Sequence, residues 1–420
     1  MNKQPPVPSS QPTASAFIAL DLGTTTLSGS MIDPSGTTLA KAKALNPQQE
    51  FGVDLLTRLN AALNGEGGKL QTLLVNELRY LVETLLEISG RTPQDIVGIA
   101  VAGNPGMSCL LRNTPVDSLL FPPHKPPFKN LVRIPPSEID IGLSALMELL
   151  PPVSGFVGGD LIACLLAMGD VKPGTMIIDL GTNAELALWD GTRWWVTSAA
   201  AGPAFEGGNV SCGMIHAEGA VSDVDLGVDR LELTVFGGGQ PHGICGSGLA
   251  SLIAAARMGG LVDESGRILS RDEVETNLGR YLIEKDGAMA VCFYRSVSGE
   301  LILTQEDLRS LQLAKAAVRG GVCVLLEKTG IPEEDVAQLY LTGTFGTSLS
   351  LDALKRVALL PEPMLDKTSF MANGVLAGLQ AYLLADDRQK RLESMVAKIQ
   401  PFPLSGTPAF ERHFLSALNF

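Results

Sequence analysis

The sequence predicts an α/β protein built from two related domains, and three observations lead to this prediction. The chain has 420 residues, enough for two domains with sizeable cores. Apolar runs typical of strands are interspersed with segments of helical periodicity. A motif consisting of an apolar run followed by Asp-Leu-Gly-Thr occurs twice, once near the N-terminus and once near mid-chain. A repeated motif of this kind indicates a duplicated fold.

The copy near mid-chain predicts a strand, a turn and a returning hairpin. An apolar run ending at Asp179 predicts a buried strand, and residues 181–183 supply the small and hydroxyl groups of a tight turn. A second strand at 184–189 ends in Asp190-Gly191, which is typical of a hairpin, and a third strand follows at 193–198.

This turn has the chemistry of a phosphate site. Backbone N–H groups exposed at a tight turn hold phosphate oxygens, and a carboxylate at a strand end holds a hydrated magnesium ion beside them. We therefore expect Asp179 to hold the water shell of Mg²⁺, and Gly181, Thr182 and Asn183 to donate hydrogen bonds to phosphate. The sequence predicts a nucleotide phosphate here.

The copy near the N-terminus occupies residues 17–26 and also precedes a possible returning strand, at 27–32. By the same chemistry we expect Asp21 to hold hydrated Mg²⁺, and Gly23, Thr24 and Thr25 to donate to phosphate. A single motif of this type is often an ordinary junction between a strand and a turn. Two copies indicate a duplicated fold with phosphate held between the halves.

Composition excludes several classes of function. The chain is 45% apolar and 18% charged, which is typical of a globular protein. Its net charge of −13 argues against general affinity for nucleic acid or an anionic membrane. The apolar stretch at 250–261 is interrupted by Arg257 and is too short for a membrane span, and no signal peptide is visible. We therefore expect a cytoplasmic protein.

The six cysteines are scattered, and no two of them form a C-x-x-C pair. Zinc sites and ferredoxin-type clusters need grouped thiolates, so neither a zinc site nor a [2Fe–2S] cluster is expected in this chain. Most of the cysteines are interpreted as small core residues in a reducing compartment.

The first domain is predicted at residues 16–174, after a polar, proline-rich linker at 1–15. It opens with the first motif and continues with a helix near 53–63, in which Arg58 lies one turn beyond Asp54 and is expected to pair with it. Further along we expect a long helix at 70–89, a buried strand at 96–102 that runs into a ligand-contacting loop at 103–106, and a helix opening at Asp160, either as a cap or as a site residue.

Prolines are frequent between residues 120 and 152. Proline removes a backbone donor and interrupts both helices and sheet ladders. We therefore expect this segment to be an irregular excursion over the first domain, with neither a central strand nor an uninterrupted helix.

The second domain is predicted at residues 175–372, and a C-terminal helical segment, 373–420, is expected to dock back onto the fold. Within the second domain we expect strands in 217–236, a helix at 249–258 and a helix from a capping box at Thr304 to about residue 328.

Two glycine-rich turns of the second domain are further site candidates. Gly343 and Gly346 follow an apolar strand, and their lack of side chains would let a purine or ribose lie against the backbone. Gly202 and Glu206 lie in a loop expected to line the ligand cleft. Glu206 is interpreted either as orienting an attacking water or as a structural, ion-paired residue.

These turns together resemble the superfamily of acetate and sugar kinases, heat-shock chaperone ATPases and actin. The resemblance implies a two-domain actin-like ATPase fold, with duplicated ribonuclease-H-like halves and a nucleotide cleft between them. It also implies that the two Asp-Leu-Gly-Thr turns face each other across ATP and Mg²⁺, and that the late glycine turn holds adenosine.

Within this superfamily the chain is most similar to the ATP-dependent reductive activators of corrinoid proteins. The similarity covers roughly residues 16–420 and is carried by six segments: 44–48 (ALNPQ), 51–54 (FGVD), 199–213 (AAAGPAFEGGNVSCG), 243–249 (GICGSGL), 313–317 (LAKAA) and the closing segment around Phe410. It implies that ATP binding and hydrolysis drive the reduction of cob(II)alamin to cob(I)alamin in a corrinoid-binding protein, which serves methyl transfer. A homodimer is also compatible with it.

The chain departs from this family's pattern in two places. The activators usually carry a [2Fe–2S] ferredoxin-like domain ahead of the ATPase region, whereas here only the linker precedes the fold. The electrons are therefore expected from a separate donor, a ferredoxin or a flavoprotein. The second departure is Asn104-Pro105-Gly106, where the family more often has two threonines after the asparagine.

Other readings stay open from the sequence. The chain is alternatively a nucleotide-dependent, chaperone-like binding module for a cofactor protein, or a small-molecule kinase. A third alternative resembles the activators of 2-hydroxyacyl-CoA dehydratases, in which Cys212 and Cys245 of two subunits would hold one bridging [4Fe–4S] cluster. His216 and His242 are candidate cobalt ligands in a corrinoid complex, or simply hydrogen-bonded loop residues.

Overall fold

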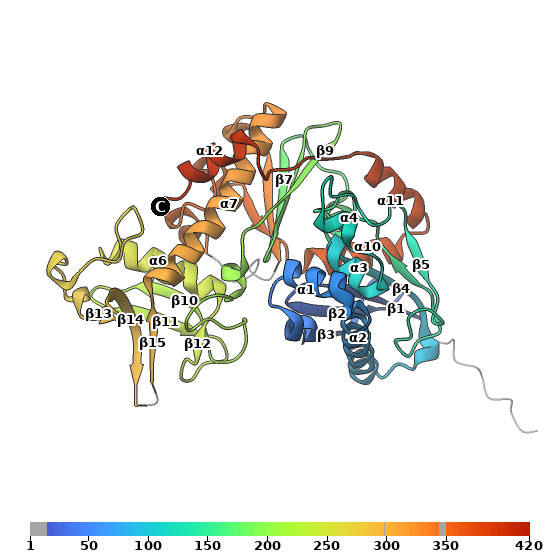
Figure 1. The fold of residues 1–420 in the computed structure, drawn as a ribbon, viewed down its shortest axis with the longest axis horizontal. Coiled ribbons are helices and arrows are strands. Elements are labelled where there is room, and N and C mark those ends of the chain that lie inside the picture. The colour runs from blue at the N-terminus through green and yellow to red at the C-terminus, as the bar shows by residue number, and fades with distance from the viewer. Residues whose placement is uncertain (1–14, 298, 344–349) are drawn as a thin grey trace, which may run out of the picture. The chain divides into compact units, whose positions relative to one another are not determined.

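A computed structural model describes residues 15–297, 299–343 and 350–420. Two compact units divide the chain (Figure 1). The first unit comprises the residues up to Ala167 together with 375–396, and the second comprises 168–374 together with 397–420. The residues after 373, expected to act as one docked segment, are thus shared between the two units.

The first unit is built on a six-stranded sheet in the order β3-β2-β1-β4-β6-β5. Strands β1, β2 and β3 form an antiparallel meander, and β4 and then β6 extend the sheet in parallel from β1. The bounds are β1 (Ala16–Leu22), β2 (Thr26–Ile32), β3 (Thr38–Leu45), β4 (Ile96–Gly103), β5 (Val132–Ile134) and β6 (Met147–Leu149).

Seven helices lie wholly or mainly in this unit: α1 (Leu55–Ala61), α2 (Gly67–Ser89), α3 (Pro105–Arg112), α4 (Asp117–Leu120), α5 (Gly159–Met168), α10 (Gly374–Leu384) and α11 (Arg388–Ala397). Helix α2 buries leucines at intervals of three and four residues, which puts one apolar stripe against the sheet. The stripe consists of Leu70, Leu74, Leu78, Leu81 and Leu85, all of which belong to the core.

The proline-rich segment does contribute to the sheet, and the expectation that it would hold no central strand was wrong. Strand β6 pairs with β4 on one side and β5 on the other, so it is an interior strand. The prolines at 135–136 and 151–152 lie just outside the two short strands. They therefore limit the length of the strands without removing a ladder hydrogen bond.

The second unit repeats five strands of this topology, while its sixth strand, β18, pairs parallel with β9 at the opposite edge. Its main sheet has the order β17-β16-β7-β8-β9-β18, in which β7, β8 and β9 form an antiparallel meander and β16 and then β17 extend it in parallel from β7. The bounds are β7 (Thr175–Leu180), β8 (Ala184–Trp189), β9 (Trp194–Ala199), β16 (Gln338–Gly343), β17 (Thr368–Phe370) and β18 (Ile399–Pro401). The duplication predicted from the two motifs is therefore present in the connectivity of the two sheets.

The described residues of the second unit also form two small sheets and five helices. One sheet contains β10 (Ala220–Leu226), β11 (Leu231–Val235) and β12 (Gly243–Ile244), and the other β13 (Leu282–Lys285), β14 (Ala288–Ser296) and β15 (Gly299–Leu303). The helices are α6 (Gly246–Met258), α7 (Gln305–Thr329), α8 (Leu351–Arg356), α9 (Glu362–Leu365) and α12 (Pro408–Ser416). The capping box expected at the start of α7 is formed by Thr304 and Asp307.

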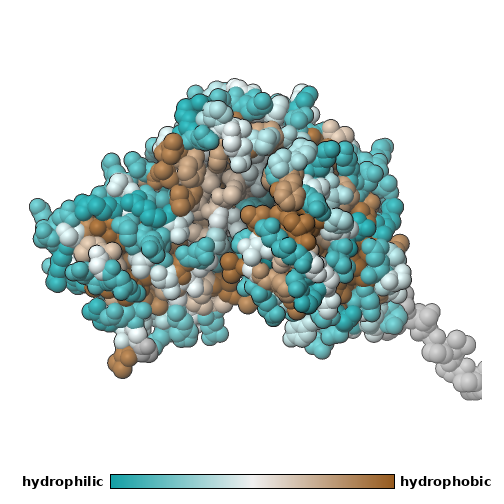
Figure 2. Space-filling model, viewed as in Figure 1, coloured by the Kyte–Doolittle hydropathy of each residue, from teal (hydrophilic) through white to brown (hydrophobic). Residues whose placement is uncertain are grey.

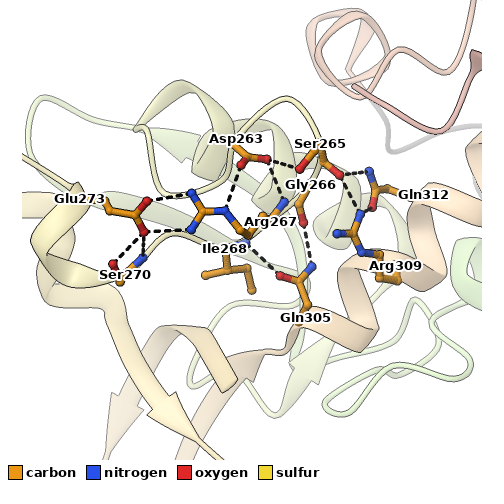
Figure 3. A network of polar contacts seen from close by, with 10 residues as sticks. All are labelled: Asp263, Ser265, Gly266, Arg267, Ile268, Ser270, Glu273, Gln305, Arg309 and Gln312. Carbon is orange, nitrogen blue, oxygen red and sulfur yellow. Dashed lines mark hydrogen bonds and ion pairs between the residues drawn. The ribbon is translucent and has the colours of Figure 1, made fainter. Parts of the chain in front are cut away.

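A polar network fastens the loop after α6 to the start of α7 (Figure 3). Arg267 forms a two-pronged ion pair with Glu273 and a further one with Asp263. From α7, Gln305 and Arg309 donate to backbone carbonyls of the loop. These bonds hold an irregular segment of the second unit in one conformation.

Hydrophilic residues cover most of the face in Figure 2, and hydrophobic residues form separate patches. Val228 and Val297, which follow β10 and β14, are among the most exposed apolar side chains. In the described part of the chain, no helix combines the length and the apolar character needed to cross a membrane.

Candidate functional site

The first predicted phosphate turn, Gly23-Thr24-Thr25, links the end of β1 to β2. Asp21 lies on β1 opposite Ser28 of β2 and Ala102 of β4, so its side chain emerges near the end of two parallel strands. A Cβ atom on Gly23 would lie 2.3 Å from the carbonyl oxygen of Thr26. Only glycine therefore fits the first position of this turn.

Residues 46–58 hold the turn through its backbone carbonyls. Asn46 Nδ2 donates to Gly23 O at 3.0 Å, Arg58 Nη1 to Thr24 O at 2.7 Å, and Gln49 Nε2 to Thr25 O at 3.2 Å. In a planar trans peptide the C=O and the following N–H point in opposite directions. The N–H groups of Thr24 and Thr25 therefore point away from residues 46–58, which is the arrangement that an anion-binding turn requires.

The side chain of Thr24 is held as well. Asn104 Nδ2 donates to Thr24 Oγ1 at 3.1 Å, while Asn104 Oδ1 accepts from the N–H of Met107 at 2.9 Å. Asn104 is thus the N-cap of α3, and Pro105 and Gly106 are the first residues of that helix. The prediction of a loop at 103–106 was wrong, because proline is well suited to the first position of a helix.

Asp160 lies near the same strand end. A Cβ atom on Gly158 would lie 2.4 Å from Gly103 O, 2.5 Å from Asn104 Cα and 2.8 Å from Asp160 Oδ1, so these groups surround one point. Asp160 Oδ1 accepts from the N–H of Leu161 at 2.8 Å. Burial nevertheless raises the pKa of Asp160 to about 6, because desolvation outweighs the backbone hydrogen bonds that favour the anion.

The expected pair between Arg58 and Asp54 is not among the ion pairs within 4.0 Å that the described residues form. Asp54 instead caps α1, accepting from the N–H and the hydroxyl of Thr57 at 2.8 and 2.7 Å. Arg58 is fully buried and donates to the carbonyls of Thr24, Gly52 and Val53. An Asp that begins a helix satisfies backbone donors first, and this competes with pairing one turn later.

The second predicted phosphate turn, 181–183, is held by the glycine-rich loop that follows β9. The N–H of Gly202 donates to Thr182 O at 2.8 Å, and the hydroxyl of Thr182 donates to the carboxylate of Glu206. Within the turn, the N–H of Gly181 donates to Asn183 O at 3.2 Å. Because Thr182 O points toward Gly202, the N–H of Asn183 points to the opposite side.

Asp179 lies on β7 between Glu185 of β8 and Thr342 of β16. Glu185 is buried, accepts from Ser198 Oγ at 3.1 Å and was not singled out from the sequence. Gly343, at the end of β16, packs against the end of β7 and has a φ of +96°. A Cβ atom on Gly343 would lie 2.3 Å from Leu180 O and 2.7 Å from Asp179 Oδ1. Gly346, the other adenosine candidate, lies outside the described residues.

The predicted site residues therefore form two clusters, one in each unit. The first contains Asp21, Gly23, Thr24 and Thr25, and the second contains Asp179, Gly181, Thr182, Asn183, Gly202, Glu206 and Gly343. No group of three or more His, Cys, Asp or Glu side chains able to hold a metal exists among the described residues. A magnesium ion that keeps most of its waters needs only one or two carboxylates beside phosphate oxygens, so the residues present fit such an ion.

The histidine and cysteine candidates lie elsewhere in the second unit. Cys245 is 2% exposed, and its Sγ contacts His216 Nδ1 at 3.5 Å and Ser247 Oγ at 3.3 Å. Burial, together with Asp307, raises the pKa of the Cys212 thiol to about 11. A cluster ligand must be a thiolate that reaches the partner, so these surroundings do not favour a bridging cluster. His216 lies against Phe236 with the two rings tilted by 55°, and His242 packs beside Gly219.

The residues that hold the first turn were not predicted from the sequence to do so. Asn46 and Gln49 lie in or next to the segment ALNPQ, which carried part of the family resemblance. Asn104 stands where the family pattern keeps its asparagine. Their presence in recognisable motifs was a signal, but the acceptors to which they donate, 23 to 80 residues away, could not be predicted from the sequence.

Two family models match the chain. The one described as the C-terminal domain of RACo, the ASKHA domain, matches residues 174–420, and the one described as the RACo middle region matches 17–170. These matches meet at residues 170–174, close to the division between the two units at 167 and 168.

Three relatives are similar over most of the chain. The corrinoid activation enzyme RamQ of Eubacterium limosum is 30% identical over 383 residues, 88% of this chain and 64% of the relative. The [Co(II) methylated amine-specific corrinoid protein] reductase of Methanosarcina barkeri is 26% identical over 386 residues, 82% of this chain and 65% of that protein. The solved structure of a reductive activator for a corrinoid, iron–sulfur protein matches with a TM-score of 0.88 and 27% identity, covering 98% of this chain and 67% of the other. The chain thus spans slightly less than two thirds of the first two relatives.

Proposed function

Because this chain belongs to the RACo family and carries its ASKHA domain, we propose that it is an ATP-dependent reductive activator of a corrinoid-binding protein. In this proposal ATP binding and hydrolysis drive the one-electron reduction of cob(II)alamin to cob(I)alamin in the partner. The observation that supports the proposal is the pair of turns whose carbonyls accept hydrogen bonds from neighbouring segments, which leaves the N–H groups of the same peptides on the opposite side, where phosphate would bind. The choice of a corrinoid protein as the partner is based on the names of the relatives.

ATP would be bound by the two turns and by the glycine turn after β16. Thr24, Thr25 and Asn183 would donate backbone N–H groups to phosphate oxygens, while Asp21 and Asp179 would hold the water shell of Mg²⁺. The bound ion would neutralise the charge that develops on the terminal phosphoryl group. Gly343 and Gly346 would let adenosine lie against the backbone.

Glu206 fits a positioning role better than a direct one. Its carboxylate accepts a hydrogen bond from the hydroxyl of Thr182, and the N–H of Gly202 in the same loop donates to Thr182 O. In this proposal Glu206 sets the direction in which the second turn presents its N–H groups, and positioned donors of this kind account for most of the catalysis of phosphoryl transfer.

The electron balance requires a donor. Reduction of cob(II)alamin to cob(I)alamin consumes one electron, and a separate reduced ferredoxin or flavoprotein would lose it. ATP supplies no electrons; its binding and hydrolysis would drive the transfer in the unfavourable direction. The corrinoid protein is the substrate in this scheme, and the donor is the co-reactant.

The test is anaerobic ATP hydrolysis with and without a corrinoid protein in the cob(II)alamin state, with a reduced ferredoxin as donor. We expect the corrinoid protein to stimulate hydrolysis and the cob(I)alamin absorbance to grow only when ATP is present. If no corrinoid protein changes the rate of ATP hydrolysis, the proposal is contradicted and a kinase is favoured. ATP binding without turnover would favour a binding module.

A further inference from the structure

Residues 46–58 form a support behind the first phosphate turn. Three side chains from this segment, those of Asn46, Gln49 and Arg58, donate to three consecutive carbonyls of the turn. The N–H of Asn46 adds a second bond to Thr25 O at 2.9 Å. Every peptide plane of the turn is therefore oriented by this one segment.

Arg58 makes the shortest of these bonds and is the most unusual residue of the support. Its side chain is fully buried, and its guanidinium donates to Thr24 O at 2.7 Å, Gly52 O at 2.8 Å and Val53 O at 3.4 Å. Within the described part of the chain, Arg58 takes part in no ion pair shorter than 4.0 Å. Burial lowers the pKa of Arg58 to about 10, so the group keeps its charge at neutral pH.

The charge of Asp54 favours the Arg58 cation, but the two form no ion pair within 4.0 Å and burial outweighs this attraction. A buried cation held in this way is costly, so its retention calls for a physical role. The planar fork of arginine is suited to holding several acceptors at fixed angles, which a lysine ammonium does not do. By fixing Thr24 O, the fork fixes the N–H of Thr25 on the opposite side of the same peptide. Its charge also lies one hydrogen bond behind a turn expected to receive phosphate.

We propose that Arg58 is a positioning residue for the nucleotide, which acts through Thr24 by directing the N–H of Thr25 toward the phosphates. The inference rests on the proposed function only in taking ATP as the ligand of the turn. Asn104 holds the same threonine from its hydroxyl side, so Thr24 is fixed at two points.

Three variants separate the possible roles of these contacts. Arg58→Met removes both the charge and the three bonds, whereas Arg58→Lys keeps the charge and loses the fork. Asn104→Ser keeps a residue that caps α3 but is too short to reach Thr24. The matched control is Gln48→Met, because Gln48 is equally buried in the same segment and donates to Leu70 O, not to the turn.

The experiment measures dissociation constants of the purified variants for Mg²⁺·ATP by calorimetry and for adenosine by NMR titration, together with melting temperatures. We expect Arg58→Met and Arg58→Lys to weaken ATP binding by about tenfold or more, and Asn104→Ser by severalfold. Adenosine binding should be unchanged in all of them, because the proposed function has adenosine against the glycine turn after β16 and not against this turn. Gln48→Met should lower the melting temperature and leave both constants unchanged.

Other results would overturn the inference. Equal weakening of ATP and adenosine would show a general structural role, and wild-type affinity in Arg58→Lys would show that charge alone is required. If Arg58→Met does not fold, Arg58→Lys and Asn104→Ser still decide. A wild-type protein that binds neither ligand would contradict the proposed function itself, whereas normal ATP binding in the variants would contradict only this inference.

Discussion

At the scale of single residues, Asp160 illustrates how burial and hydrogen bonding compete at one carboxyl group. Backbone N–H groups at the start of α5 favour the anion, but desolvation is the largest influence and raises the pKa to about 6, above the ordinary value of 3.8. The native state therefore holds the proton more tightly than the unfolded chain. The stabilisation is complete below about pH 4 and is lost as the pH rises through about 6.

Replacement of this carboxyl by an amide is expected to remove that dependence. The free energy of unfolding of wild type should fall relative to Asp160→Asn between about pH 4 and pH 7, by at most about 3 kcal/mol. Urea unfolding of both proteins at a series of pH values measures the difference. The control is Asp95→Asn in the same unit. Hydrogen bonds from Thr92 lower the pKa of Asp95 below its ordinary value of 3.8, so its difference from wild type should change in the opposite direction, at about pH 4 and below, and stay nearly constant between about pH 5 and pH 7.

Asp179 is expected to be needed for turnover and not for folding. Asp179→Asn keeps the shape of the side chain but removes the charge proposed to hold the magnesium shell, so ATP hydrolysis should fall at least about a hundredfold with little change in melting temperature. Asp190→Asn is the control with the opposite expectation: it should lower the melting temperature and leave ATP hydrolysis unchanged. Asp190 accepts hydrogen bonds from Thr192, Arg193 and Trp195 at the β8–β9 turn. Normal hydrolysis by Asp179→Asn would refute the assignment.

Residues of the candidate site were predictable from sequence where local pattern decided the position. Asp21 and Asp179 were expected at strand ends before small-residue turns, and the structure places them in β1 and β7 there. Arg58 was not, because spacing along a helix suggested Asp54 as its partner. Its carbonyl acceptors depend on how residues 24 and 58 meet in space, which no local rule contains.

At the scale of elements, Gly343 lets the end of β16 pack closely against Asp179 of β7. Gly343→Ala would place a methyl group 2.7 Å from the Asp179 carboxylate in a backbone conformation that alanine rarely adopts. Gly330→Ala at the end of α7 has the positive φ without the close contacts. We expect Gly330→Ala to cost about 1–2 kcal/mol of stability and leave ATP hydrolysis unchanged. Gly343→Ala should cost more and also reduce hydrolysis; equal effects on hydrolysis would contradict the proposed contact.

The elements that were predicted correctly from the sequence differ from those that were not in the strength of their local pattern. The meander β7–β8–β9 and the capping box of α7 were predicted because alternation, turn residues and the Thr304–Asp307 spacing all agreed. Strand β6 was missed because three residues between proline clusters give no periodicity, and only pairing with β4 and β5 makes them a strand. Asn104 was read as a loop residue although asparagine followed by proline is also typical of a helix start.

At the scale of the whole molecule, duplication is visible in both sequence and connectivity. In each unit a three-stranded antiparallel meander comes first in the chain, and the strands that pair in parallel with its first strand follow later. The Asp-Leu-Gly-Thr motif occupies the same place in both units, at the junction of the first two strands of the meander. The division of the C-terminal residues was not predictable, because their partners lie up to several hundred residues away. Gln380 donates to Ser30, and Arg388 pairs with buried Glu148, both in the first unit.

The last residues belong instead to the second unit, and this predicts the effect of a truncation. Strand β18 pairs with β9, Leu404 is buried in the core of that unit, and α12 packs on α7. Removal of residues 398–420 should therefore expose α7 and β9 to hydrogen exchange and lower the stability of the second unit. Protection of β1, β2 and β4 should remain at the wild-type level, since α10 and α11 are retained and hold the first unit through Ser30 and Glu148. Equal loss of protection in both units would mean that the two unfold as one cooperative body, and the division into separate units would not describe how the chain is stabilised.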